Sequence, residues 1–287
     1  MNRTILALGL AAVLAAPLVA RADPLSVFQP PRVRAIAVTP LDIDALRALP
    51  PLSTFGTLRG TVSPAVDRVG SRADAAREAG FALRLPSGVP AALASRVEYA
   101  VTGPARTTFT FEAAKARAWA RSRGVAPAPL PPGLDGARYT VTLRPVVLVT
   151  YGSRPRRAVG PHRRSSAERG ARLGDFFSVM QGPVPTVAAR GASLETLVRW
   201  FAAQPGVPPR LAAEVRAIGD PTQTLPIPVR FDKQTASRVR VDGVEGLVIG
   251  DETGIGSAVV WTKGGRIYAA GGTLPQSRVL ALADTLR

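Results

Sequence analysis

The spacing of apolar residues along the chain predicts helices and strands in separate blocks. The clearest helix starts at Ser193 and ends before Pro205. Its apolar side chains recur at spacings of three and four residues: Leu194, Leu197, Val198 and Phe201. Further helices are predicted over 71–79, 112–123 and 209–218, with a short one over 41–49 and a terminal amphipathic one over 276–286.

Strands are predicted between these helices, where apolar and polar residues alternate. The pattern favours a strand over 81–85 and then a hairpin, in which 97–101 and 107–111 flank the Gly103-Pro104 turn. A long strand over 139–151 is expected to bend or break at Pro145, and 176–180 to resume the sheet. An antiparallel meander follows over 227–269, with a turn at Asp242-Gly243.

The order of these elements predicts an α+β fold with antiparallel sheets, helices packed on one face, and a C-terminal β-meander plus a terminal helix. We expect residues 1–22 to be a signal peptide and 23–62 to be a Pro-rich tether. An N-terminal α+β region is predicted over 63–190. Residues 191–287 are predicted to contain a helical pair, the meander and the last helix.

The first segment has the features of a secretory signal peptide. Arg3 supplies positive charge, an apolar run of 17 residues follows over 4–20, and Ala20 and Ala22 are the small residues that signal peptidase requires. We therefore predict cleavage between Ala22 and Asp23 and a periplasmic or secreted protein. The alternative is an uncleaved anchor, although a membrane-spanning helix needs about 20 apolar residues. No transmembrane segment is predicted after cleavage.

Composition limits the chemistry of the chain. With 46% hydrophobic residues it can bury a core without covalent cross-links. It has no cysteine, which excludes disulfides, thiolate zinc sites, iron–sulfur clusters and cysteine nucleophiles. Its one histidine, His162, cannot form a histidine-rich metal centre. No cofactor or metal site is predicted.

The net charge of +17 suggests an anionic partner, yet 37 basic residues include only three lysines. Arginine, alanine, glycine and proline are all favoured by GC-rich codons, so the total charge alone is weak evidence. A basic loop over 154–172 holds seven arginines and one glutamate. Its candidate ligand-binding residues are Arg154, Arg156, Arg157, Arg163 and Arg164, whose guanidinium groups could bind an anionic envelope lipid or polymer. The alternative is a solvated loop.

Nucleic acid is not expected as a partner. The basic loop lacks the interleaved aromatic residues on which bases stack, and export separates the protein from nucleic acid. The aromatic residues that stand elsewhere are candidates for an apolar ligand cavity: Trp119, Trp200, Phe201, Trp261 and Tyr268. The alternative is that they belong to the core. The sequence therefore leaves a lipid, a peptide or no ligand open for these side chains.

The sequence gives less support to a catalytic function than to ligand binding. His162 lies between arginines with no carboxylate predicted to orient its ring, and no Gly-x-Ser-x-Gly motif occurs. Two acidic pairs, Asp42 with Asp44 and Asp251 with Glu252, lie beside turns or in the tether and are typical of surface charge. We predict a protein that is not an enzyme. A hydrolase that uses His162 or a carboxylate pair is the alternative, and a structural envelope protein is a third.

The C-terminal residues resemble a known domain. Residues 239–246, then Val260-Trp261 with Gly265 and Tyr268, and a final helix over 280–286, are similar to a domain of unknown function that many bacterial anti-sigma factors carry outside the membrane. The resemblance covers roughly the last 50 residues, and the sigma-binding helices have no counterpart. It implies an exported sensor-like or binding module of the cell envelope, with an envelope protein as a further candidate partner.

Overall fold

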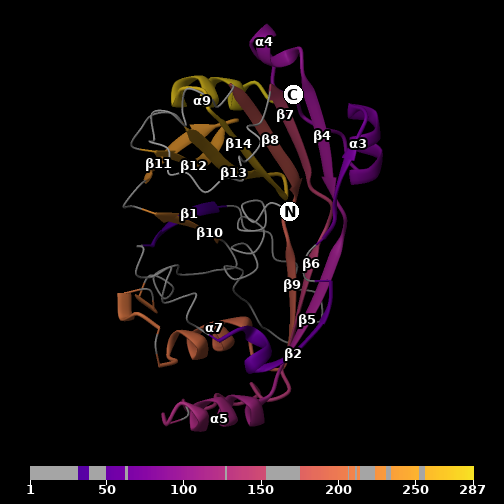
Figure 1. Cartoon of the computed structure of the whole chain (residues 1–287). Helices are drawn as coiled ribbons and strands as arrows, with labels where there is room; N and C mark the ends of the chain where they lie inside the picture. The colour runs from indigo at the N-terminus through magenta and orange to yellow at the C-terminus, as the bar shows by residue number, and fades with distance from the viewer. Residues whose placement is uncertain are drawn as a thin grey trace, which may run out of the picture. The chain divides into compact units, whose positions relative to one another are not determined.

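The fold is α+β, as the sequence predicted (Figure 1). The computed structural model describes residues 32–38, 50–61, 64–126, 128–152, 175–205, 207–210, 212–213, 224–230, 234–251 and 256–287. The described strands form an eight-stranded and a four-stranded antiparallel sheet, and a parallel pair made by β1 (Arg32–Val38) and β10 (Thr224–Arg230). None of the described helices has the length and apolar character needed to cross a membrane.

The chain forms two compact units, and each unit is assembled from separate segments. Unit 1 takes its described residues from Met1–Pro64, Pro104–Arg144 and Val184–Asp232. Unit 2 takes them from Ala65–Gly103, Pro145–Pro183 and Lys233–Arg287. This grouping differs from the contiguous regions 63–190 and 191–287, because strands from distant parts of the chain pair within each unit.

Proline marks four of the places where the chain passes between the units: Pro64, Pro104, Pro145 and Pro183. Proline has no N–H to give to a sheet ladder, so pairing in one sheet stops there. The hairpin predicted around Gly103-Pro104 is therefore wrong. Strand β4 (Val97–Thr102) pairs in the eight-stranded sheet, whereas β5 (Ala105–Phe111) pairs in the four-stranded sheet. The predicted break at Pro145 is confirmed.

Unit 2 is built on the eight-stranded sheet. Its order is β11 (Gln234–Val241), β12 (Val244–Asp251), β13 (Ser257–Lys263), β14 (Arg266–Gly272), β8 (Phe176–Pro183), β7 (Val147–Gly152), β4, β3 (Val66–Val69). The helices of this unit are α3 (Arg72–Ala79), α4 (Ala91–Ala94) and α9 (Gln276–Asp284). The C-terminal meander is confirmed over β11–β14, with its Asp242-Gly243 turn and the terminal helix. Its predicted start at Ile227 is wrong, because that residue lies in β10, which pairs in parallel with β1.

One row of paired side chains forms the core of unit 2. The residues opposite one another across the strands are Tyr99, Val149, Val179, Ala270, Val259 and Val248. Helix α9 packs on β13 and β14 and buries Val279, Leu282 and Ala283 in the same cluster. Helix α3 begins as predicted, with the Ser71 side chain accepting from the backbone of Asp74, and ends at Gly80 in the left-handed conformation.

The strand predicted over 81–85 is wrong. Leu83 is buried, and the backbone of Leu85 exchanges two hydrogen bonds with Arg287, the last residue. The backbone of Arg84 pairs with the side-chain amide of Gln181, at 2.9 Å and 2.8 Å. The Gln181 side chain and the backbone of Arg287 thus supply hydrogen-bond partners for the backbone of this segment. The alternation of apolar residues reflects side-chain burial, and the segment does not pair as a strand.

Unit 1 contains the four-stranded sheet, in the order β2 (Gly56–Gly60), β5, β6 (Arg138–Leu143), β9 (Thr186–Arg190). Its further elements are the short helix η1 (Leu52–Thr54), α5 (Ala113–Ser122) and α7 (Leu194–Ala202). Helix α7 starts where predicted, since the Ser193 side chain accepts from the backbone of Thr196 at 3.0 Å. Strands β1 and β2 lie within the segment predicted as a tether. The helix predicted over 41–49, and most of the one over 209–218, fall outside the described residues.

Candidate functional site

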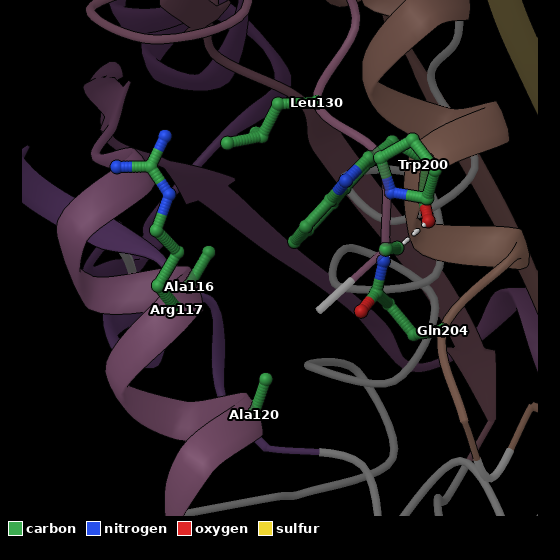
Figure 2. A pocket seen from close by; sticks show the side chains of 8 residues that line it. Ala116, Arg117, Ala120, Leu130, Trp200 and Gln204 are labelled. Atoms are coloured by element: carbon green, nitrogen blue, oxygen red, sulfur yellow. Dashed lines mark hydrogen bonds between the residues drawn. The ribbon is translucent and has the colours of Figure 1, made fainter. Parts of the chain in front are cut away.

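A cavity of about 240 Å³ opens in unit 1 between α5, residues 128–130 and the C-terminal end of α7. Its lining is mainly apolar: Ala116, Arg117, Ala120, Ala128, Pro129, Leu130, Trp200 and Gln204. Figure 2 shows the residues of α5 on one side of this space, with Trp200 and Gln204 on the other. We call this cavity the unit 1 pocket.

Small side chains on α5 leave room for the pocket. The buried face of this helix presents Ala113, Ala116 and Ala120, none of which reaches beyond its Cβ. The helix is held at its first turn, where the Ala113 N–H donates to Asp135 Oδ1 at 2.8 Å. Because alanine combines high helix propensity with small volume, the sequence forms a stable helix here without filling the adjacent space.

An aromatic cluster supports the opposite wall. The ring of Trp200 lies 4.9 Å from that of Phe111 and 5.5 Å from that of Phe55, edge to face in both cases. Phe55 also contacts Trp119 and Phe201 at 5.2 Å. These contacts fix the Trp200 indole, while its buried Nε1–H and that of Trp119 have no acceptor among the described residues. A buried donor without a partner costs about 1–3 kcal/mol, and both of these atoms are shielded from solvent by the cluster.

Gln204 is held at the far side of the pocket. Its side-chain Nε2 donates to the Trp200 carbonyl at 2.8 Å, and the residue is 6% exposed (Figure 2). The bond ties the end of α7 to the chain that follows it. The pocket therefore has one wall fixed by aromatic packing and a buried hydrogen bond, and another formed by the alanines of α5.

Both units are basic. Over the full sequence unit 1 has 18 basic and 9 acidic residues, and unit 2 has 19 and 11. Arg117 is exposed, lines the pocket and forms no ion pair with any described residue. An anionic group at this edge would lie within reach of the Arg117 guanidinium.

The candidate aromatic residues of the C-terminal meander lie elsewhere. Trp261 and Tyr268 are buried in the core of unit 2, with their rings stacked at 5.4 Å. Neither lines the unit 1 pocket. Gly246 pairs with Trp261 across β12 and β13 in a crowded position, where an added Cβ would come within 2.8 Å of Val241 Cγ1 and 3.2 Å of the Trp261 Cβ.

The other predicted site residues, except Asp251, lie outside the described part of the chain. Arg154, Arg156, Arg157, Arg163 and Arg164 lie outside the described residues, as do His162, Asp42, Asp44 and Glu252. Asp251 is the last residue of β12. Among the residues that can be described, no three histidine or acidic side chains gather as metal ligands.

A buried polar network in unit 2 joins three distant segments. Asp242, in the hairpin turn, accepts from Arg84 at 2.5 Å and from Lys263 at 2.8 Å. Its backbone N–H donates to Asp284 Oδ1 of α9 at 2.7 Å. Burial raises the pKa of Asp242, but hydrogen bonds from Arg84 and Lys263 outweigh it and hold the pKa below its ordinary value. We assign this network to stability, because it fastens the turn to α9 and to the 81–85 segment.

Most of the pocket was not identified from the sequence. Trp200 was a candidate, but Arg117, Ala116, Ala120, Leu130 and Gln204 were not. The sequence signal for a pocket was the set of alanines on the apolar face of α5, because their side chains are too small to fill the space beside the helix. No family model matches this chain, and no curated protein or solved structure is significantly similar to it.

Proposed function

We propose that this protein is an exported, non-enzymatic binding module of the bacterial cell envelope, whose ligand is an anionic amphiphile. The observation that supports the proposal is the unit 1 pocket, an apolar cavity with the exposed Arg117 at its edge. The apolar part of the ligand would enter between α5 and Trp200, and its anionic group would pair with Arg117. The C-terminal resemblance to an anti-sigma-factor domain agrees with a sensor-like role.

The size of the pocket limits the ligand. Pockets for drug-sized molecules occupy about 300–1,000 Å³, and the volume here is about 240 Å³. A short acyl segment or a single ring fits this space better than a larger molecule. Each methylene group that leaves water contributes about 0.8 kcal/mol, so a medium-length acyl chain would supply useful affinity.

Octanoate is a suitable first probe, because it combines a medium acyl chain with one carboxylate. We expect calorimetric titration to detect saturable binding to the mature protein. Ala120→Leu should abolish binding by filling the pocket, since Ala120 lines it. Arg117→Gln should weaken binding by roughly tenfold, the loss of one charge-assisted hydrogen bond.

The matched control is Ala114→Leu, which adds the same atoms to an exposed position of the same helix. It should bind octanoate like the wild type. If Ala120→Leu remains folded by circular dichroism and binds octanoate with unchanged affinity, the assignment of the pocket is wrong.

Export gives a separate prediction. The protein isolated from the envelope of its own host should begin at Asp23, which intact-mass measurement would show directly. A mass that still includes residues 1–22 would instead indicate an anchored protein. Recovery of the protein only from the cytoplasmic fraction would contradict the localisation.

A further inference from the structure

One face of the four-stranded sheet in unit 1 is accessible to solvent and carries hydroxyl and guanidinium groups. Successive side chains of a strand point to opposite faces of a sheet, and in β2, β5, β6 and β9 one set belongs to the aromatic core of the unit. No member of the other set is buried. Its threonines are Thr57, Thr108, Thr110, Thr140, Thr142 and Thr186. Its arginines are Arg59, Arg106, Arg138 and Arg190, and Ala188 completes it. We call these residues the Thr–Arg face.

The strand register arranges these side chains in rows. In one row Thr110 lies opposite Thr57 of β2 and Arg138 of β6, and Arg138 lies opposite Arg190 of β9. Neighbouring strands are about 4.8 Å apart, and side chains on the same face of one strand are about 7 Å apart. The face therefore presents hydrogen-bonding groups at regular intervals in two directions across four strands.

The charges on this face have one sign. No acidic residue belongs to it, and Arg138 lies directly opposite Arg190, a like-charged pair that destabilises a sheet. Strands β11 and β12 of unit 2 differ, because Arg238 contacts Glu245 at 3.7 Å and Arg240 lies directly opposite the same glutamate. High β propensity explains threonine at exposed strand positions, but it does not explain an arginine pair that repels itself. An anionic group bound between the two guanidinium groups would remove that repulsion.

Hydrogen bonds within the face leave groups for a ligand. The Thr108 and Thr140 hydroxyls bond to each other at 3.0 Å, so one of the two O–H groups can still donate outward. At one corner Thr57 donates to Glu112, the residue before α5. Lys115 Nζ offsets this carboxylate, because it donates to Glu112 Oε1 and to Thr57 Oγ1, each at 3.1 Å.

We propose that the Thr–Arg face binds a linear acidic polysaccharide. Sugar hydroxyls donate and accept hydrogen bonds as threonine hydroxyls do, and sugar carboxylates match the paired donors of arginine. A small anion would contact only one or two of the arginines, whereas a polymer can cross several strands. The face carries no apolar side chain larger than alanine to enter a bilayer, and no aromatic side chain on which nucleic acid bases could stack. None of its residues lines the unit 1 pocket, so this site does not rest on the proposed function.

Calorimetric titration of the mature full-length protein with alginate oligosaccharides provides the measurement. Alginate is a linear uronate polymer, so each sugar offers a carboxylate and hydroxyl groups. Dextran, a neutral polysaccharide, and polyglutamate, an anionic polymer without hydroxyl groups, are the comparison ligands. We expect saturable binding of alginate that weakens at high salt, and much weaker binding of the other two polymers.

Arg138→Gln with Arg190→Gln should weaken alginate binding by at least about tenfold, because two charge-assisted hydrogen-bonding groups are lost. The matched control is Arg121→Gln with Arg123→Gln, two exposed arginines at the end of α5 that lie in the same unit but outside the face. Both variants lose two positive charges. The control should bind alginate within about twofold of the wild type.

Thr108→Val with Thr140→Val tests the hydroxyl groups. Valine keeps the β-branched shape, and changing both partners leaves neither hydroxyl without its bond. Alginate binding should weaken by roughly fivefold, the effect of about one hydrogen bond. Thr235→Val, at an exposed position of β11 in unit 2, should bind like the wild type. Circular dichroism would show that each variant is folded.

Three results would overturn the proposal. Equal losses in the two arginine variants would reduce binding to a general attraction of charge. Polyglutamate that binds as tightly as alginate would mean that the threonines recognise nothing. Failure to bind alginate would also overturn it, and sedimentation with anionic vesicles would then assign the face to a lipid surface. Octanoate affinity should be unchanged in the variants of the face, so this site and the unit 1 pocket can fail independently.

Discussion

Replacing Trp261 with alanine is expected to reduce the free energy of unfolding by about 3–5 kcal/mol, the usual cost of removing a large aromatic side chain from a packed core. Trp261 is fully buried, stacks on Tyr268, and belongs to the same cluster as α9. The space that the indole leaves cannot close easily, because Gly246 opposite it has no side chain to move in. Denaturant unfolding followed by circular dichroism would measure the loss.

Trp261→Phe serves as the conservative comparison. It keeps an aromatic ring beside Tyr268 and should lose much less stability than the alanine variant. Octanoate affinity should be unchanged in the phenylalanine variant, because Trp261 does not line the unit 1 pocket. A loss below about 1 kcal/mol for Trp261→Ala would contradict a core role and favour the ligand-binding interpretation of this residue.

Replacing Asp242 with asparagine is expected to destabilise the protein by about 2 kcal/mol at neutral pH, below the 3–5 kcal/mol typical when one partner of a fully buried ion pair is removed. Arg84 and Lys263 would lose their shared carboxylate, although both are partly exposed and would recover some hydration. Asparagine tolerates the left-handed conformation that this position adopts, with φ of 50°. The substitution therefore tests the charge and not the turn.

The effect of this substitution should depend on pH in a defined direction. The pKa of Asp242 is lower in the folded protein than its ordinary value. The stabilisation is therefore fully present above the unfolded pKa, about 3.9, and is lost as the pH falls through the folded pKa. Unfolding measured from pH 6 down to about pH 2 should show the wild type and Asp242→Asn converging at the acid end. A constant difference across that range would contradict the role of the Asp242 carboxylate.

Local sequence signals predicted individual elements well. The helix starts at Ser193 and Ser71 were predicted correctly because the capping hydrogen bond that fixes such a start is made within a few residues. The Asp242-Gly243 turn was recognised because only certain residues adopt the positive φ of a tight hairpin. Such features depend on neighbours in sequence and need no knowledge of the rest of the chain.

Two predictions failed where distant residues supplied the partners. The alternation over 81–85 is typical of a strand, but its backbone bonds to Gln181 and Arg287, which are 97 and 202 residues away. The segments beside Gly103-Pro104 look like a hairpin, yet each finds its partners in a different sheet. Alternating apolar residues indicate which face of a strand is buried. They do not indicate which other strand pairs with it.

The sequence by itself determined the class of fold, the starts of the main helices, the C-terminal meander and the absence of cysteine chemistry, because propensity, capping and composition are local properties. Only the tertiary structure placed Trp261 in a core and Trp200 beside a pocket, although both are tryptophans in apolar patterns. Burial depends on which segments pack together, and interleaved segments such as these meet only once the chain has folded.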